Sequence, residues 1–354
     1  MTVNVNGEHD QRMESVQAAM AARSAVRSWA EGLELIELVR ATHRAGWLKQ
    51  LRGETTAAEL AAAHGTSVKQ VSEVLAVLSS ANVVRPGDGS SSGDSFRLSP
   101  EFDALVAGAA GVEMTVVLDA VELARSQVAR AVRPTDQEPG AGIEGAQALV
   151  LARDWGLRPT PAARQLIGML YEALPEFRAR LESGGPLLDV GTGVGGALIT
   201  GLTLFEGLRA VGVESVPEVA AECRRRTEAA GVADRVDIRT TDARALSDES
   251  AFSACFWAQP FFSEDVRADT LTVIFRALRP DGLLLVQELF PPGSTQDEPT
   301  LRAGLDRLFF TQRHIPFGLS AEELAAEGHA AGFRDARVTD SALGKLVLMR
   351  KPDC

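Results

Sequence analysis

The sequence predicts an α/β protein in which a mainly helical N-terminal domain precedes a mostly parallel sheet. With 354 residues, the chain is too long for one ordinary hydrophobic core and suits two domains. Helical spacing of apolar residues dominates the first half, whereas short apolar runs alternate with helical patterns from Pro186 onward. The stretch "LLDVGTGVGG", residues 187–196, joins one such run to a turn with four glycines. This turn indicates a ligand that is approached by bare backbone.

The chain is expected to divide into four segments: a disordered start over residues 1–15, a winged-helix domain over 16–110, a helical linking region over 111–185 and a ligand-binding domain over 186–354. In the linking region, helical patterns cover residues 112–132 and 161–181. The polar, glycine-rich stretch between them, residues 133–145, predicts a linker.

The winged helix is predicted from turn and capping signals that follow a helical stretch over residues 16–51. Thr56 and Glu59 form a capping box, and Gly65 ends that helix. Ser67 opens the next helix, so the two form a helix-turn-helix. Residues 82–99 then predict two strands around a flexible Gly/Ser tip, which is the wing of such a unit.

The charge of the chain argues against nucleic acid as a partner. The formal net charge is −12 and the pI is about 5.0, so the protein would repel a polyanion. The second helix of the pair, residues 68–80, offers only Lys69 as a cation. We therefore expect this domain to serve dimerisation, with a DNA-binding, ligand-sensing regulator as an alternative.

The last segment predicts seven strands joined largely by helices. The strands are expected at residues 187–191, 208–214, 235–240, 252–258, 282–290, 333–340 and 345–351, with helices at 217–230 and 264–278. Gly344 is the only strong turn signal between the last two strands, so they should pair antiparallel. Only one nucleotide-binding half is present, which leaves no second half for a dinucleotide.

Acidic residues follow three successive predicted strands and narrow the choice of ligand. Asp189 interrupts an apolar strand just before the glycine turn, where a buried carboxylate needs hydrogen bonds or a cation. S-adenosylmethionine carries both an ammonium and a sulfonium. Glu214 could accept from two ribose hydroxyls, and Asp242 from an adenine amino group, with the Ala243 amide donating to the ring. Taken together, these positions favour S-adenosylmethionine over a dinucleotide.

At this point the chain resembles a known family. The order "LLDVGTGVGG", "VGVESVPEVAAECRRR", "TTDARAL", "FWAQPFF", "ALRPDGLLLVQELFPP" and "GHAAGFRDARV" resembles the class I S-adenosylmethionine-dependent methyltransferases. The stretch "AAELAAAHGTSVKQVSEVLAVLSSANVV" is similar to the winged-helix dimerisation domain of small-molecule O-methyltransferases of bacteria and plants. The resemblance implies a Rossmann-like, seven-stranded catalytic domain and a homodimer with interlocking N-terminal domains.

The resemblance also implies a cofactor site for S-adenosylmethionine. Asp189 and the glycine loop would cradle the methionine part, Glu214 the ribose, and Asp242 with Ala243 the adenine. The residues of this implied site are Asp189, Gly191, Gly193, Gly195, Glu214, Ser215, Val216, Asp242 and Ala243. The substrate would be a small, natural-product-like molecule.

The sequence departs from the family at the general base. The family usually has a His-Asp pair after the fourth strand, where this chain has Gln259 and Pro260. Glutamine cannot act as a base, so Glu288 and His314 are the candidate bases. Gln259 is kept as a candidate catalytic residue without that role. A base adds about 10²- to 10⁴-fold to a rate, and only where the acceptor must lose a proton.

The acceptor atom is left open by this departure. A carboxylate, an amine lone pair or an acidic enol can do without a base. Oxygen is slightly favoured by the family, and nitrogen or carbon by the missing histidine. A non-methylating rearrangement or hydroxylation on the same scaffold is a further alternative.

Aromatic residues predict a flat, apolar substrate pocket. They make up only 5% of the chain but cluster at Phe256, Trp257, Phe261 and Phe262, and again at Phe309 and Phe310. The candidate substrate residues are Met169, Tyr171, Trp257, Gln259, Phe262 and Phe310.

Neither a metal site nor a membrane segment is predicted. The histidines do not cluster with carboxylates at metal-ligand spacing, and Cys223, Cys255 and Cys354 are few and widely spaced. No segment approaches the ~18 consecutive apolar residues of a membrane span. We expect a cytoplasmic protein.

Overall fold

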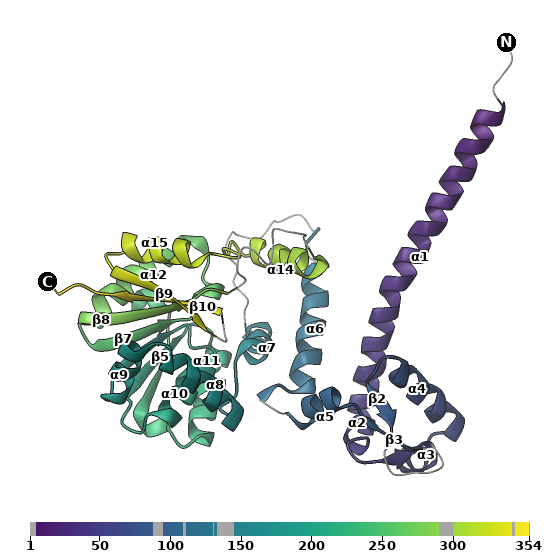
Figure 1. Cartoon of the computed structure of the whole chain (residues 1–354), viewed down its shortest axis with the longest axis horizontal. Coiled ribbons are helices and arrows are strands. Elements are labelled where there is room, and N and C mark those ends of the chain that lie inside the picture. Colours follow the sequence, from purple (N-terminus) through teal and green to yellow (C-terminus); the bar gives the residue numbers. More distant parts are fainter. Residues whose placement is uncertain are drawn as a thin grey trace. The chain divides into compact units, whose positions relative to one another are not determined.

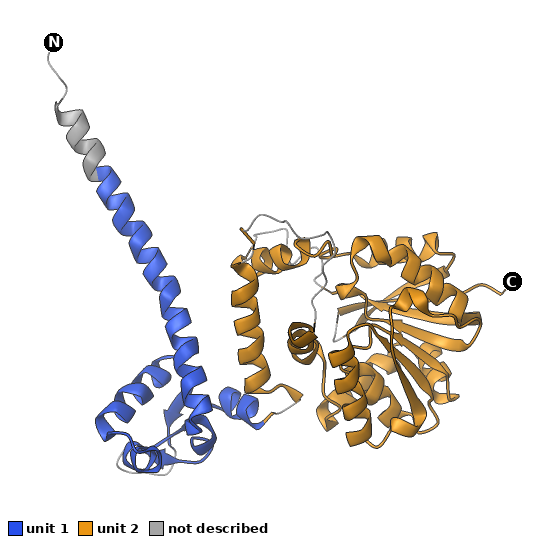
Figure 2. Ribbon diagram, turned by 180° about the vertical axis from the view of Figure 1, so that it is seen from behind, with its two compact units in different colours: residues 1–107 blue, residues 108–354 orange. Residues whose placement is uncertain are grey.

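The computed structural model describes residues 5–87, 95–108, 111–129, 131–132, 145–289, 300–341 and 344–353, with side chains from residue 14 onward. The chain divides into two compact units, residues 1–107 and 108–354, which Figure 2 shows in different colours. Among the described helices, none combines the length and apolar character that crossing a membrane would require. The predicted Gly/Ser tip of the wing lies outside the described residues.

Unit 1 combines helices with a small antiparallel sheet. Its elements are α1 (Val5–Arg44), α2 (Trp47–Gln50), β1 (Thr55–Thr56), α3 (Ala57–His64), α4 (Val68–Ser80), β2 (Val84–Pro86), β3 (Ser95–Leu98) and α5 (Pro100–Ala107). The sheet order is β1-β3-β2, and the antiparallel pairing of β2 with β3 confirms the two predicted strands.

The predicted helix signals in unit 1 are present. Thr56 and Glu59 form the reciprocal capping box, and Gly65 takes a left-handed conformation, with φ 64°, at the end of α3. The Ser67 side chain accepts a hydrogen bond from the Gln70 amide and caps α4.

Helix α1 begins at Val5, so the disordered start expected over residues 1–15 is wrong for the described backbone from residue 5. The segment has no apolar stripe that would reveal a helix to pattern reasoning. It contains one strong helix breaker, Gly7, and no proline, and it simply extends the helix predicted from residue 16.

Unit 2 starts with four helices, of which one was not predicted. They are α6 (Met114–Val128), α7 (Gly145–Trp155), α8 (Pro161–Glu172) and α9 (Pro175–Glu182). The single helix expected over residues 161–181 is split because Pro175 restricts the residue before it, and Leu174 accordingly leaves the helical region with φ −126° and ψ 65°. Helix α7 directly follows the predicted linker and was missed.

The remainder of unit 2 is a seven-stranded sheet of order β6-β5-β4-β7-β8-β10-β9. Its strands are β4 (Leu187–Val190), β5 (Ala210–Glu214), β6 (Val236–Thr240), β7 (Phe252–Trp257), β8 (Leu278–Gln287), β9 (Arg334–Ser341) and β10 (Gly344–Arg350). Strands β4 to β8 pair in parallel, whereas β10 pairs antiparallel with both β8 and β9. All seven predicted strands and the antiparallel final pair are confirmed.

Helices cover both faces of this sheet, as Figure 1 shows. The remaining α-helices among the described residues of unit 2 are α10 (Gly196–Leu204), α11 (Pro217–Ala229), α12 (Glu264–Ala277), α14 (Leu301–Thr311) and α15 (Ala321–Ala330). Residues of α8, α9, α10 and α11 form one apolar core with the sheet, and residues of α12 and α15 form the other. Every residue of β4 is buried, as expected for a central parallel strand. The chain turns in opposite directions from β4 and β7, and the carboxyl ends of these strands flank the position where ligands bind in such sheets.

Candidate functional site

The glycine turn after β4 is held against β5 and open to a ligand. The amides of Gly191 and Thr192 both donate to the Val213 carbonyl at 3.0 Å. Gly191 has φ 74°, and a Cβ there would lie 2.8 Å from Cε2 of Phe262. Gly193 has φ 57°, and a Cβ added there would meet no atom within 4 Å, so its backbone faces open space. Only glycine gives both the left-handed conformation and the close approach.

Asp189 is the buried carboxylate at the end of β4, with 3% of its surface exposed. Thr192 Oγ1 donates to its Oδ2 at 3.1 Å, while the buried Oδ1 has no hydrogen-bond partner among the described residues. Burial raises the pKa of Asp189 to about 7, with Thr192 lowering it in part and Glu214 adding to the rise. A carboxylate in this state is stabilised by any cation that enters beside it.

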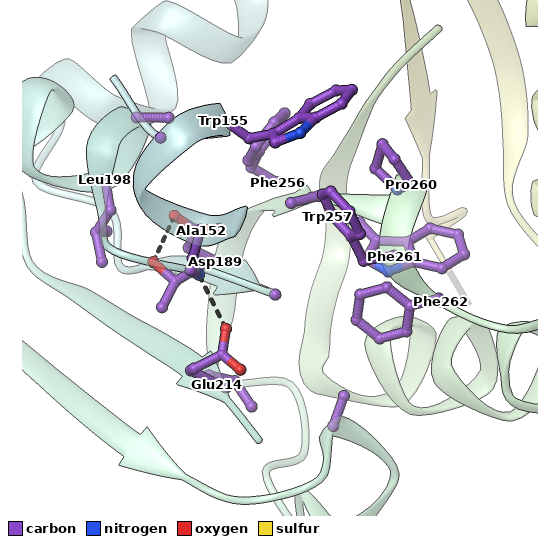
Figure 3. A pocket seen from close by; sticks show the side chains of 18 of the residues that line it. Ala152, Trp155, Asp189, Leu198, Glu214, Phe256, Trp257, Pro260, Phe261 and Phe262 are labelled. Atoms are coloured by element: carbon purple, nitrogen blue, oxygen red, sulfur yellow. Dashed lines mark hydrogen bonds between the residues drawn. The ribbon is translucent and has the colours of Figure 1, made fainter. Parts of the chain in front are cut away.

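Glu214 ends β5 on the other side of the turn. Its Oε2 accepts from the Gly193 amide at 3.1 Å and its Oε1 from the Val216 amide at 2.9 Å. Burial raises the pKa of Glu214, and these amides partly oppose the rise. Each carboxylate oxygen can accept more than one hydrogen bond, so a pair of hydroxyl groups could still bind. Figure 3 shows Asp189 and Glu214 on the same side of the pocket.

Asp242 is engaged with its neighbour Arg244 in this structure. Its carboxylate accepts from the Arg244 amide at 2.8 Å and pairs with Arg244 Nη2 at 2.7 Å. The Arg244 side chain lowers the pKa of Asp242. Both residues and the buried Ala243 line the cavity, so this end offers a carboxylate, a guanidinium and a backbone amide. The role of Asp242 toward adenine stays a prediction.

These residues share one cavity of about 480 Å³ in unit 2. Of the predicted cofactor residues, those that line it are Asp189, Gly191, Gly193, Glu214, Ser215, Val216, Asp242 and Ala243. Gly195 does not line it: its left-handed backbone, with φ 80°, caps α10. The cavity therefore brings together the polar groups at the ends of β4, β5 and β6.

Aromatic rings form the other side of the cavity, as Figure 3 shows. The aromatic lining residues are Trp155, Tyr171, Phe177, Phe256, Trp257, Phe261 and Phe262. Trp155 meets Phe261 edge-on at 5.5 Å, and Trp257 meets Phe262 edge-on at 5.4 Å. The polar side would suit a cationic ligand, and the aromatic side would suit a second, flat and apolar molecule bound next to it.

Two contributions to the cavity were missed by sequence reasoning. Helix α7 supplies Ala152 and Trp155, and a tryptophan just past a glycine-rich linker was the one available signal. Arg313 lines the cavity, stacks over the Phe309 ring at 3.9 Å and binds the Gln127 side chain. Sequence reasoning selected the neighbouring His314 as a site residue and did not select Arg313.

Gln259 lies outside the cavity, contrary to its prediction as a catalytic or substrate residue. Its side chain is buried: Arg267 Nη1 donates to Oε1 at 2.9 Å, and Nε2 donates to the Gln287 carbonyl at 3.2 Å. Arg267 in turn pairs with Glu327 at 2.6 Å. The amide thus satisfies a buried guanidinium, which explains a glutamine in this place.

The two alternative bases also lie outside the cavity lining. Glu288 is buried, with Lys345 Nζ 3.9 Å from its Oε2, and only its neighbours Gln287 and Leu289 face the cavity. His314 is exposed, with φ 53°, and its carbonyl accepts from the Glu264 amide. Neither residue is therefore among those that line the cavity.

The predicted substrate residues divide between lining and support. Trp257, Phe262 and Tyr171 line the cavity, and burial raises the pKa of Tyr171 well above its usual range. Phe310 is buried behind Phe261, with ring centroids 6.1 Å apart. Met169 is 47% exposed and lies outside the lining, because α8 turns its other face to the sheet.

Comparison with known proteins shows that Asp189, Glu214 and Asp242 lie in a region that matches a known domain. Residues 187–282 match a family model described as "Methyltransferase domain". A demethylmenaquinone methyltransferase of Thermus thermophilus is 31% identical over 134 residues, which are 37% of this chain and 56% of that protein. The chain therefore spans a little over half the length of this curated relative.

Two solved structures resemble nearly the whole chain. The mitomycin 7-O-methyltransferase MmcR gives a TM-score of 0.66 at 20% identity, covering 95% of this chain and 99% of that one. Human N-acetylserotonin methyltransferase in complex with SAM gives 0.67 at 15% identity, covering 94% and 98%. At such identities the likeness concerns the fold. Residues 187–282 match the methyltransferase domain model, and the chain has a Rossmann-like fold that these two methyltransferases share.

Proposed function

We propose that this protein is an S-adenosylmethionine-dependent methyltransferase that acts on a small, flat, largely apolar molecule. The observation that carries the proposal is Asp189, whose buried Oδ1 has no partner among the described residues and which lies beside an open glycine turn. A nicotinamide dinucleotide offers that oxygen no ammonium or sulfonium. The cofactor supplies a methyl group on a positively charged sulfur, which is already activated for transfer.

The chain's own residues would hold this donor by charge and hydrogen bonds. Asp189 and the backbone of Gly191 and Gly193 would hold the charged methionine part. Glu214, fixed by two backbone amides, would accept from the ribose hydroxyls. Asp242 and Ala243 would hold the adenine, provided that Asp242 shares its carboxylate between Arg244 and the base.

The aromatic side of the cavity indicates the class of acceptor. Trp155, Phe261 and Phe262 present ring edges and faces that suit a planar ring or a polyene. Holding acceptor and donor in line at ~3–3.5 Å provides much of the rate of such a displacement. Exclusion of water by the same rings would keep the donor from being hydrolysed.

The absence of histidine from the described lining bears on the acceptor atom. A phenol of ordinary acidity would need a base, and no histidine stands among the described lining residues to serve as one. We propose an acceptor that needs no base. An oxygen that is ionised at neutral pH is the preferred acceptor atom, and an amine or an acidic carbon is the second choice. MmcR, an O-methyltransferase by name, shares the fold and is consistent with oxygen.

We also propose that the protein works as a homodimer through its N-terminal unit. This proposal comes from the resemblance of that unit to dimerisation domains and from the exposed apolar side chains of α1. The homodimer is tested by the molecular mass of the full-length protein in light scattering, which should be twice that of one chain.

The function is tested by incubating the full chain with S-adenosylmethionine and a panel of planar aromatic acceptors. The panel should contain acidic enols or phenols, arylamines and simple phenols. We expect S-adenosylhomocysteine together with a product heavier by one methyl group, from the acidic oxygens first. Product without S-adenosylhomocysteine would instead indicate a rearrangement or hydroxylation and would contradict the proposal.

A further inference from the structure

Helix α1 carries an exposed apolar stripe with the spacing of a coiled coil. Val26, Trp29 and Leu33 are 57%, 70% and 49% exposed, although they are large apolar side chains. They belong to a series whose members are three or four residues apart in strict alternation: Ala19, Ala22, Val26, Trp29, Leu33 and Ile36. This is the a and d pattern of a heptad repeat. Figure 2 shows α1 projecting from the rest of unit 1.

We propose that this stripe pairs with the same stripe of a second copy of the chain, with the two α1 helices antiparallel. The proposal specifies the surface of the homodimer proposed above and rests on it. In an interface with two-fold symmetry, the same patch is used on both copies and must be complementary to itself. The stripe has this property in the antiparallel arrangement only.

The sizes of the stripe residues fit an antiparallel pair. Small side chains stand at the N-terminal end of the stripe and large ones at the C-terminal end. Antiparallel alignment about the middle of the stripe sets three pairs opposite each other: Ala19 with Ile36, Ala22 with Leu33, and Val26 with Trp29. Each layer then joins a smaller side chain to a larger one, which gives even packing along the pair.

A parallel pair would pack badly. Each residue would then face its own copy, with Trp29 against Trp29 at one end and Ala19 against Ala19 at the other. The first layer is overfilled and the second leaves a void, and both faults destabilise a packed interface.

The helix dipoles favour the same direction, because they oppose each other in the antiparallel pair and lie side by side with the same polarity in a parallel one.

The direction can be tested by disulfide trapping in the full chain with Cys354→Ser. Cys223 and Cys255 are buried and can stay. In the antiparallel register, positions 22 and 33 of different copies face each other within reach of a disulfide. Position 22 of one copy is then roughly 16 Å along the helix from position 22 of the other, from about 1.5 Å of rise per residue. That distance is too long for a disulfide.

The expected result is a covalent dimer on mild oxidation of the Ala22→Cys, Leu33→Cys double variant, and none from either single variant. A covalent dimer of the Ala22→Cys single variant would show parallel helices and overturn the proposal. A dimeric mass by light scattering without trapping of the double variant would also overturn it, while leaving the homodimer intact. A monomeric mass would refute both the pairing and the homodimer, but not the methyltransferase activity.

Discussion

Replacing Asp189 by asparagine should weaken donor binding and, at the same time, stabilise the ligand-free protein above neutral pH. The reason is that burial raises the pKa of this carboxyl from its usual value near 3.8 to about 7 in the folded chain. The favourable contribution of its protonated form is fully present below pH 3.8 and is lost as the pH rises through about 7. The neutral amide of an asparagine removes this loss, although it also removes the charge that the donor needs.

The magnitudes follow from the size of the pKa change. At about 1.4 kcal/mol for each tenfold change in proton affinity, the rise corresponds to ~4.5 kcal/mol at most in the free energy of unfolding at pH 8. If the donor binds only the ionised carboxylate, about nine tenths of the protein is competent at pH 8 and about one tenth at pH 6. Donor affinity of the wild type should therefore fall about tenfold between these values.

The assay is calorimetric titration with S-adenosylmethionine at pH 6, 7 and 8, paired with urea unfolding of the ligand-free protein. Asp189→Asn should bind at least tenfold more weakly at pH 8 and lose the pH dependence that Asp189 causes. Glu288→Gln is the matched control, since Glu288 is also buried but lies outside the cavity. Equal donor affinity of Asp189→Asn and wild type at pH 8 would refute the reasoning.

Three further substitutions follow from the site. Glu214→Ala should weaken donor affinity at least tenfold by calorimetry, because two ribose hydroxyls lose their acceptor; unchanged affinity would remove Glu214 from the site. His314→Ala should keep its kcat within about twofold in the methyl-transfer assay, because His314 is exposed and outside the cavity, and a loss of 10²-fold or more would restore it as the base. Gly191→Ala should lose donor binding, because the added Cβ would lie 2.8 Å from the Phe262 ring, and a variant that binds normally would show that the turn can shift.

The strands and the shared position of the three acidic residues could be predicted because both depend on local signals. A central parallel strand is a nearly continuous apolar run, and β4, interrupted only by Asp189, and β7, with one serine, are such runs closed by turn residues. Since parallel strands all end at one edge of the sheet, Asp189, Glu214 and Asp242 could be placed together from their positions alone. The structure brings these three into one cavity.

The places of Gln259 and Trp155 could not be predicted because they depend on contacts between distant segments. The amide of Gln259 is held by Arg267, which is itself placed by Glu327 on a later helix. Nothing near Gln259 in the sequence reveals that partner. In the same way, Trp155 reaches the cavity because α7 packs against α6 and α11.

The most direct measurement for the central claim is a crystal structure of the full chain grown with S-adenosylhomocysteine. The account predicts the ligand in this cavity, with its ribose hydroxyls within about 3.2 Å of the Glu214 carboxylate and its ammonium on the side of Asp189. A cavity that stays empty at saturating ligand, or a ligand bound elsewhere on the chain, would contradict it.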